Sequence, residues 1–185
     1  MWSAQQLTEA VWYANTHGLE PPQFEQPKYN MFARERIECE YMPMYKAPYR
    51  LGTTVFSPMA VGLLSGNYIK APPVQNNQGG RVKTAEKWIS DGTMAKVEKL
   101  KAYAEEKLGA SMPQLAIAWC LKNENVTTCL LGASKPEQLR ETLGAIAVAR
   151  KMTPADMKAI DEILDNKPEA YMGFGGTGPR PIEGL

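Results

Sequence analysis

The stretch TTVFSPMAVGLLSGNY, residues 53–68, changes from a strand-like pattern to a loop without becoming polar. The β-branched and apolar residues from Leu51 to Phe56 predict a β-strand. This pattern stops at Ser57-Pro58, and the glycine-containing loop that follows stays apolar. Surface loops are usually polar, so we expect some other part of the molecule, or a ligand, to cover this one.

A second strand pattern lies over Val126 to Leu131 and ends in Gly132-Ala133-Ser134, directly before Pro136. The order is therefore strand, glycine turn and helix N-terminus. A shorter extended pattern covers Gln23 to Gln26. We count about three strands, and a complete eight-stranded β/α barrel takes about 250 residues.

Helices are predicted between and around these strands. Two Ser-x-x-Gln capping boxes, at Ser3 and Ser111, precede apolar residues at helical spacing. The expected helical segments are residues 4 to 17, Arg34 to Tyr45 with an interruption at Pro43, Met94 to Leu108, 112 to Leu121, and one opening at Thr153-Pro154. The alternation of strands and helices predicts an α/β fold with a parallel sheet, in one domain.

Composition and charge argue against several classes of function, including nucleic-acid binding and membrane insertion. The 185 residues carry a net charge of +1 with both signs interspersed, which gives no basic footprint for nucleic acid. Apolar runs such as Leu115 to Leu121 are far shorter than the ~20 residues of a membrane helix, and the N-terminus has no secretory pattern. The three cysteines are widely spaced and fit neither a disulfide framework nor a zinc site, so we expect no metal and a reducing, cytoplasmic compartment: Cys39, Cys120 and Cys129.

Two strand ends are suited to approach a ligand, one at Phe56 and one at Gly132 to Ser134. In parallel β/α folds ligands bind at the carboxyl ends of the strands, and helix N-termini attract phosphate. Ser134 can donate a hydrogen bond there, and Lys135 adds positive charge. The alternative is that Ser134 caps the helix and does nothing else.

Other polar and aromatic residues have simpler explanations. Glu35, Glu38 and Glu40 are expected on the solvated face of a charged helical stretch, because nothing places them in a cleft. The four tryptophans are expected to be packing residues: Trp2, Trp12, Trp88 and Trp119.

Four blocks of the sequence resemble the C-terminal half of an aldo-keto reductase, most of all the branch that contains the cytoplasmic β-subunits of voltage-gated potassium channels. These are PPQFEQPKYNMF, VFSPMAVGLLSGNY, SMPQLAIAWCLKNENVTTCLLGASKPEQLRETLGAI and MTPADMKAIDEILDNKP. The resemblance covers residues 1–168 in the correct order. Residues 169–185 are rich in Gly and Pro and are expected to form a flexible tail.

The resemblance implies a (β/α)8 barrel, of which this chain holds only the C-terminal part. The family binds NADPH across the carboxyl ends of the strands and reduces aldehydes or ketones to alcohols. On matching positions, Gln26 would hydrogen-bond the nicotinamide carboxamide and the Phe56 ring would stack on the nicotinamide. Arg81 would correspond to a basic residue of the loop over the cofactor.

Two further groups of cofactor-binding residues follow from the resemblance. The first would wrap the pyrophosphate side: Ser57, Pro58, Met59, Ala60 and Val61. The second would hold the adenosine 2′-phosphate, ribose and adenine: Gly132, Ala133, Ser134, Gln138 and Glu141. This chain departs from the channel subunits at three positions, where Phe56 replaces a tryptophan, Asn67 a phosphate-pairing lysine and Thr142 an adenine-contacting asparagine.

The catalytic tetrad of the family, an Asp, a Tyr, a Lys and a His, comes from the first half of the barrel. Met1 matches the point just after the fifth strand, so the first five strands and their catalytic loops would precede this sequence. We therefore expect no catalytic residue here and no carbonyl reduction by the chain alone. His17 does not match the tetrad histidine and is expected at a helix end.

Three functions stay open from the sequence. The chain is the cofactor-binding half of an NADP(H)-dependent reductase of small aldehydes or ketones, a redox-sensing module of a membrane channel, or an inactive truncated product. A barrel that lacks its first five strands has open sheet edges, so we also expect the isolated chain to be poorly soluble, to form a homo-oligomer through those edges, or to be ordered only beside its other half.

Overall fold

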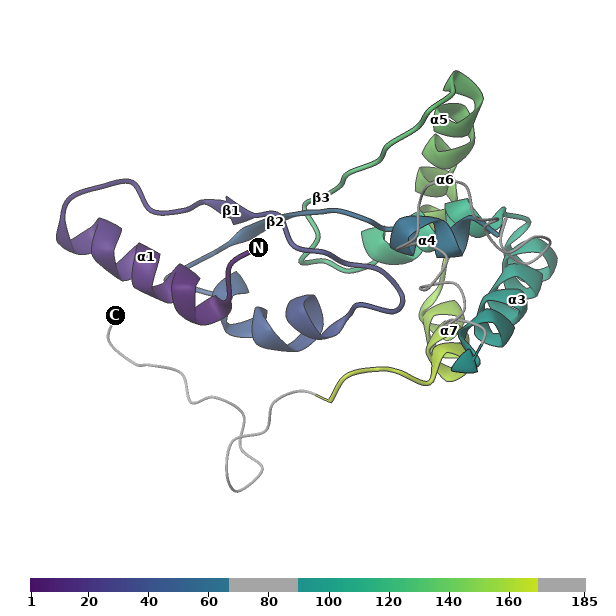
Figure 1. Cartoon of the computed structure of the whole chain (residues 1–185), viewed down its shortest axis with the longest axis horizontal. Coiled ribbons are helices and arrows are strands. Elements are labelled where there is room, and N and C mark those ends of the chain that lie inside the picture. Colours follow the sequence, from purple (N-terminus) through teal and green to yellow (C-terminus); the bar gives the residue numbers. More distant parts are fainter. Residues whose placement is uncertain (67–89, 170–185) are drawn as a thin grey trace.

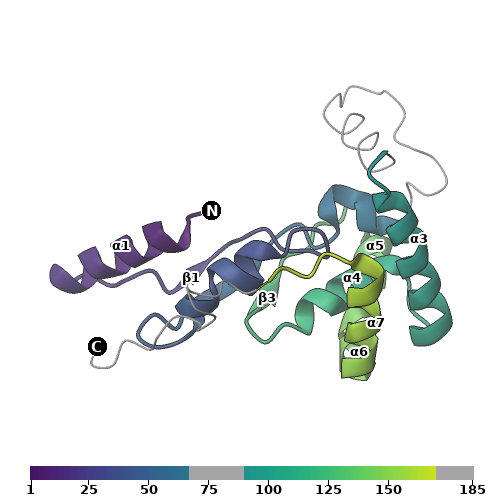
Figure 2. The same cartoon turned by 90° about the horizontal axis from the view of Figure 1, so that it is seen from below.

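The computed structural model of the chain describes residues 1–66 and 90–169. Figure 1 shows an elongated molecule in which helix α1 (Ala4–Thr16) lies at one end and the helices from α3 (Thr93–Tyr103) onward lie at the other. Three short strands lie between them, and the view turned by 90° shows the same division (Figure 2). Arg81 and the predicted tail beyond Glu169 lie outside the described residues.

The strands form one parallel sheet in the order β1 (Phe24–Glu25), β2 (Gly52–Val55) and β3 (Thr128–Cys129). Gly52 is the partner of Phe24, and Cys129 is the partner of Val55. All three strands were predicted in these places, although each is shorter than its sequence pattern. The sheet does not close, so the described part of the chain is an open piece of a barrel architecture.

The predicted helices are present. The segment from Arg34 to Tyr45 is interrupted as predicted, but at Tyr41 and not at Pro43: a π-helical turn η1 (Arg36–Glu40) is followed there by a 3-10 turn η2 (Met42–Tyr45), which has Pro43 in its first turn. The remaining elements are η3 (Ala60–Ser65), η5 (Ala104–Leu108), α4 (Met112–Leu121), α5 (Pro136–Leu143), α6 (Ala145–Lys151) and α7 (Pro154–Leu164).

Local sequence signals explain where several helices begin and end. At α1 the Ser3 hydroxyl accepts from the Gln6 amide at 3.2 Å, while the Ser3 amide donates to the Gln6 side chain at 2.8 Å. At α4 the Ser111 amide donates to Gln114 at 3.0 Å. Gly109, in the left-handed conformation at φ +59°, ends η5 because a residue without Cβ adopts this conformation at little cost.

Helix α4 is the centre of the core. Seven of its ten residues are buried, and it packs against α5, α6, η3 and β3. Trp119 on α4 stacks on Tyr29 with ring centroids 5.0 Å apart. The prediction that the tryptophans are packing residues is correct for Trp119 and wrong for Trp2 and Trp12, which are exposed. Trp88 lies outside the described residues.

Arg34 connects the segment after β1 to the C-terminal helix. Its guanidinium donates to Glu38 and, at 2.8 Å, to Asp161 on α7, and it lies over the Trp119 ring. Glu38 also accepts from the Tyr29 hydroxyl at 2.8 Å. The expectation that Glu38 belongs to a solvated face is therefore wrong, whereas Glu35 is exposed. The spacing of charged residues in the sequence does not reveal that Arg34 is buried and that its guanidinium pairs with Glu38.

Within residues 1–66 and 90–169, no helix is both long enough and apolar enough to cross a membrane.

Candidate functional site

The segments that leave β1 and β2 are held side by side beyond the strand ends. The Phe56 amide donates to the Pro27 carbonyl at 3.0 Å, and the Tyr29 amide donates to the Phe56 carbonyl at 3.2 Å. Gln26 directly precedes this pairing and is exposed, and the Phe56 side chain is partly exposed. The structure therefore brings the two predicted nicotinamide-contacting residues to neighbouring positions at one edge of the sheet.

The loop after β2 has an unusual backbone. Ser57, Ala60 and Val61 have positive φ values of 58°, 48° and 58°, and Gly62 follows at 95°. Residues with a side chain adopt this region at a cost of about 1–3 kcal/mol each, and such strain clusters at ligand sites. The chain tolerates it here because neighbouring groups fix the loop, which is the arrangement expected of a preorganised binding loop.

Asn30 and Ser57 hold this loop in place. The buried Asn30 amide donates to the Ser57 carbonyl at 2.9 Å, and the Ser57 hydroxyl accepts from the Val61 amide at 3.2 Å. Asn30 was not singled out in the sequence, because its role depends on β1 and β2 lying side by side. Asn30 therefore fixes the backbone of the loop at Ser57, a role that the local sequence does not indicate.

The apolar residues of the loop are covered by protein. Pro58, Ala60, Leu63 and Leu64 are buried, and η3 packs against α4. Val61 differs, since 51% of its surface is exposed. The expectation that another part of the molecule covers this loop is therefore correct for these buried residues, and Val61 stays exposed.

At the end of β3, residues 132–134 run exposed toward α5. Three donors converge on the Gln138 side-chain oxygen: the Ser134 amide at 2.9 Å, the Ser134 hydroxyl at 3.1 Å and the Lys135 amide at 3.2 Å. Lys135, not Ser134, occupies the N-cap position. The alternative in which Ser134 serves as the helix N-cap is therefore not what the structure shows, and its hydroxyl points to the same acceptor as the two amides.

The two strand ends lie at the same edge of the sheet. The Leu130 amide donates to the Val55 carbonyl at 2.8 Å, which fixes the exits of β2 and β3 next to each other.

Two further residues singled out in the sequence, Glu141 and Thr142, lie on helix α5, and their side chains make no hydrogen bond to these strand ends within the described residues. Glu141 is exposed and takes part through its backbone carbonyl, which accepts from Gln114 at 2.9 Å. Thr142 is buried, and its hydroxyl donates to the Leu139 carbonyl at 3.1 Å, so it is turned into its own helix.

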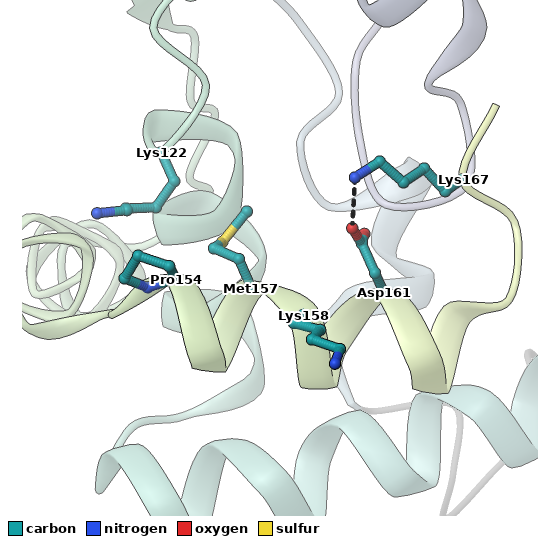
Figure 3. Close-up of a pocket in the computed structure, with 6 residues that line it drawn as sticks. All are labelled: Lys122, Pro154, Met157, Lys158, Asp161 and Lys167. Carbon is teal, nitrogen blue, oxygen red and sulfur yellow. Dashed lines mark ion pairs between the residues drawn. The ribbon is translucent and has the colours of Figure 1, made fainter. Parts of the chain in front are cut away.

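A surface depression lies elsewhere, beside α7 (Figure 3). It has a volume of about 370 Å³ and is lined by Lys122, Pro154, Met157, Lys158, Asp161 and Lys167. Lys167 pairs with Asp161 at 3.2 Å, and both belong to the C-terminal part of the chain. None of the predicted cofactor-binding residues lines this depression. Among the described residues, no group of three or more His, Cys, Asp or Glu could hold a metal ion.

Comparison with known proteins gives a consistent result. The family model for the Aldo/keto reductase family matches residues 1–165. A protein of Oryza sativa subsp. japonica named "Probable voltage-gated potassium channel subunit beta" is 40% identical over 171 residues, which cover 91% of this chain and 52% of the relative. An Arabidopsis thaliana protein of the same name is 38% identical over the same shares. The chain thus spans about half the length of these relatives, and it belongs to the aldo/keto reductase family.

Proposed function

We propose that this chain supplies the NADP(H)-binding part of an aldo/keto reductase that reduces small aldehydes or ketones. The observation that carries the proposal is the convergence of the Ser134 hydroxyl, the Ser134 amide and the Lys135 amide on one acceptor oxygen at the N-terminus of α5. In the proposal, a phosphate oxygen of the cofactor takes the place that the Gln138 oxygen now holds. Exposed amides and the helix dipole favour a negative group there.

The residues at the strand ends fit a dinucleotide. Phe56 offers an aromatic face to stack on a nicotinamide, and Gln26 offers an exposed carboxamide beside it. The strained loop from Ser57 to Gly62 exposes Val61, and Lys135 adds a cation near the phosphate position. The residues at the end of β2 offer apolar and aromatic contacts for a nicotinamide ring, and those before α5 offer hydrogen-bond donors and a positive charge for a phosphate. NADP(H) has both kinds of group.

The cofactor, when bound, supplies the hydride for reduction of a carbonyl carbon. The role of this chain is to bind and orient it. The Phe56 side of the site would fix the nicotinamide, while the Ser134 side would distinguish NADPH from NADH through the 2′-phosphate. We assign no proton donor in this chain, and we propose that the chain alone does not reduce carbonyl compounds.

A second candidate function rests on the names of the relatives, both of which are called potassium channel β subunits. In this proposal the chain is part of a redox-sensing regulatory subunit that binds the cytoplasmic side of a membrane channel. Both functions need the same cofactor site. The cytoplasm is the proposed compartment, because all three cysteines are free.

Cofactor titration tests the proposal. The purified chain is titrated with NADPH and, separately, with NADH, and quenching of tryptophan fluorescence is recorded. We expect saturable binding that prefers NADPH. In Ser134→Ala, loss of one hydrogen bond to a charged phosphate should weaken NADPH binding about tenfold, or ~1.4 kcal/mol, and leave NADH binding unchanged.

Lysine variants provide the matched charge control. Lys135→Ala should weaken NADPH binding, whereas Lys158→Ala, which removes the same charge on the remote helix α7, should not. Absence of saturable binding by a chain whose circular dichroism shows folded helices would contradict the proposal. Equal weakening by both lysine variants would mean that binding depends on overall charge alone.

A further inference from the structure

Tyr29 is bonded through its backbone to the segment that leaves β2. Its amide donates to the Phe56 carbonyl at 3.2 Å. The next residue, Asn30, donates through its side chain to the Ser57 carbonyl at 2.9 Å. Residues 29 and 30 therefore fix the backbone of Phe56 and Ser57, so a shift of Tyr29 would move the place where the Phe56 ring would meet a nicotinamide.

The side chain of Tyr29 is held by three groups. It is buried, and its hydroxyl donates to Glu38 Oε1 at 2.8 Å and accepts from the Asn123 side-chain amide at 3.0 Å. Its ring stacks on Trp119 of α4, with the ring centroids 5.0 Å apart. A buried polar group whose hydrogen bonds are satisfied makes its surroundings rigid. The position of Tyr29 is therefore set by both its ring and its hydroxyl.

The two partners of the hydroxyl are themselves held in place. The Glu38 carboxylate accepts from the Arg34 guanidinium at 2.9, 3.0 and 3.1 Å. The Asn123 side-chain oxygen accepts from the Asn125 amide at 3.0 Å. Burial, followed by the charge of Glu38, raises the pKa of Tyr29, so the hydroxyl keeps its proton and stays a donor. The hydroxyl thus connects the strand end to two fixed groups, one in η1 and one just beyond α4.

We propose that Tyr29 is a positioning residue for the nicotinamide end of the NADP(H) site and acts through the backbone of Phe56. The inference rests on the proposed function and deepens it. The phosphate end has a different support, because the polar groups of Ser134 and Lys135 bond to Gln138 on α5. A loop that is already held in its bound conformation loses less freedom on binding. Loosening Tyr29 should therefore weaken the contacts at the nicotinamide and leave those at the 2′-phosphate unchanged.

Tyr29→Phe tests the inference, because it removes the hydroxyl and keeps the ring that stacks on Trp119. The wild-type chain and the variant are titrated by calorimetry with NADPH and with adenosine 2′,5′-bisphosphate, which has the adenine and the 2′-phosphate but no nicotinamide. We expect the affinity for NADPH to fall about fivefold, roughly the effect of one hydrogen bond, and the affinity for the fragment to stay unchanged. A purely structural role would weaken both ligands equally.

Tyr103→Phe is the matched control. The Tyr103 hydroxyl also donates to a carboxylate, that of Asp156 at 2.7 Å, but it joins α3 to α7. This variant should bind both ligands as the wild type does. If Tyr29→Phe does not fold, Asn123→Ala removes the donor to the Tyr29 hydroxyl and should give the same difference between the two ligands.

The outcomes separate this inference from the proposed function. A wild-type chain that does not bind NADPH would overturn the proposed function and, with it, the role of Tyr29. If the wild type binds NADPH and Tyr29→Phe binds it equally well, only the role of Tyr29 is overturned. The same holds if Tyr29→Phe loses affinity for NADPH and for the fragment to the same extent.

Discussion

Arg34 and Asp161, 127 positions apart in the chain, form an ion pair with the Arg34 Nη1 and Asp161 Oδ1 atoms 2.8 Å apart. Arg34 also pairs with Glu38 at 2.9 Å and is almost completely buried. The pair connects the segment after β1 to helix α7. Next to it, the Asn166 side-chain amide donates to the Met31 carbonyl at 2.8 Å, so two polar contacts hold these remote segments together.

Arg34→Ala should destabilise the chain strongly. The change removes a buried cation and leaves the Glu38 and Asp161 carboxylates without it, so we expect the free energy of unfolding to fall by about 3 kcal/mol. Arg140→Ala is the matched control, because its pair with Glu137 is exposed on both sides and should contribute less than ~0.5 kcal/mol. Urea unfolding of both variants checks this. Equal midpoints would show that the Arg34 network does not stabilise the fold.

Asp156 makes the stability of the chain depend on pH. Hydrogen bonds from the Thr153 hydroxyl and amide, followed by that from Tyr103, lower the pKa of Asp156 below its usual value. A carboxylate whose pKa is lower in the folded state stabilises that state at pH values above its unfolded pKa. This contribution is lost as the pH falls through the folded pKa.

Asp156→Ala should therefore lower the free energy of unfolding by about 1 kcal/mol at pH 7, the usual effect of a lost helix cap. The difference from wild type should narrow below about pH 4. Glu162→Ala, on the exposed side of the same helix, is the control and should change stability by less than ~0.5 kcal/mol. A difference between Asp156→Ala and wild type that stays constant down to pH 2 would contradict the assignment.

Val61→Gly tests whether the loop after β2 is strained. Val61 is β-branched and has φ +58°, a conformation that costs about 1–2 kcal/mol with a side chain and little in glycine. Since half of the Val61 surface is exposed, little burial is lost. We expect Val61→Gly to equal or exceed wild type in thermal stability by up to ~1 kcal/mol. Val61→Ala keeps the strain and should not gain; a Val61→Gly variant less stable than Val61→Ala would argue against strain.

The free edge of β1 should promote association between chains. In the described part of the chain β1 pairs only with β2, and Phe24 on β1 is 62% exposed. Unpaired edges of this kind join other strands, and a charged side chain prevents it. Sedimentation velocity should show oligomers of the wild type that decrease in Phe24→Lys but not in Leu19→Lys, an exposed position outside the strands. A wild-type monomer at all concentrations would contradict this prediction.

Much of the fold follows from local sequence signals. The strand at residues 52–55 and the helices that begin after Ser3, Ser111 and Thr153 lie where β-branched runs and capping patterns predicted them. These signals act between residues that are close in the chain, so they hold whatever the rest of the fold does. The π-helical and 3-10 turns around Tyr41 were missed, because a local pattern does not specify which hydrogen-bond spacing the packing favours.

The sequence by itself determined the order of strands and helices and the family of the chain, and it predicted a ligand site at two strand ends. Tertiary structure decided that Arg34 meets Asp161 and that Asn30 holds the loop at Ser57. The physical reason is distance along the chain. Contacts between remote segments depend on how the sheet and α4 pack together, and no periodicity or cap within one segment encodes that packing.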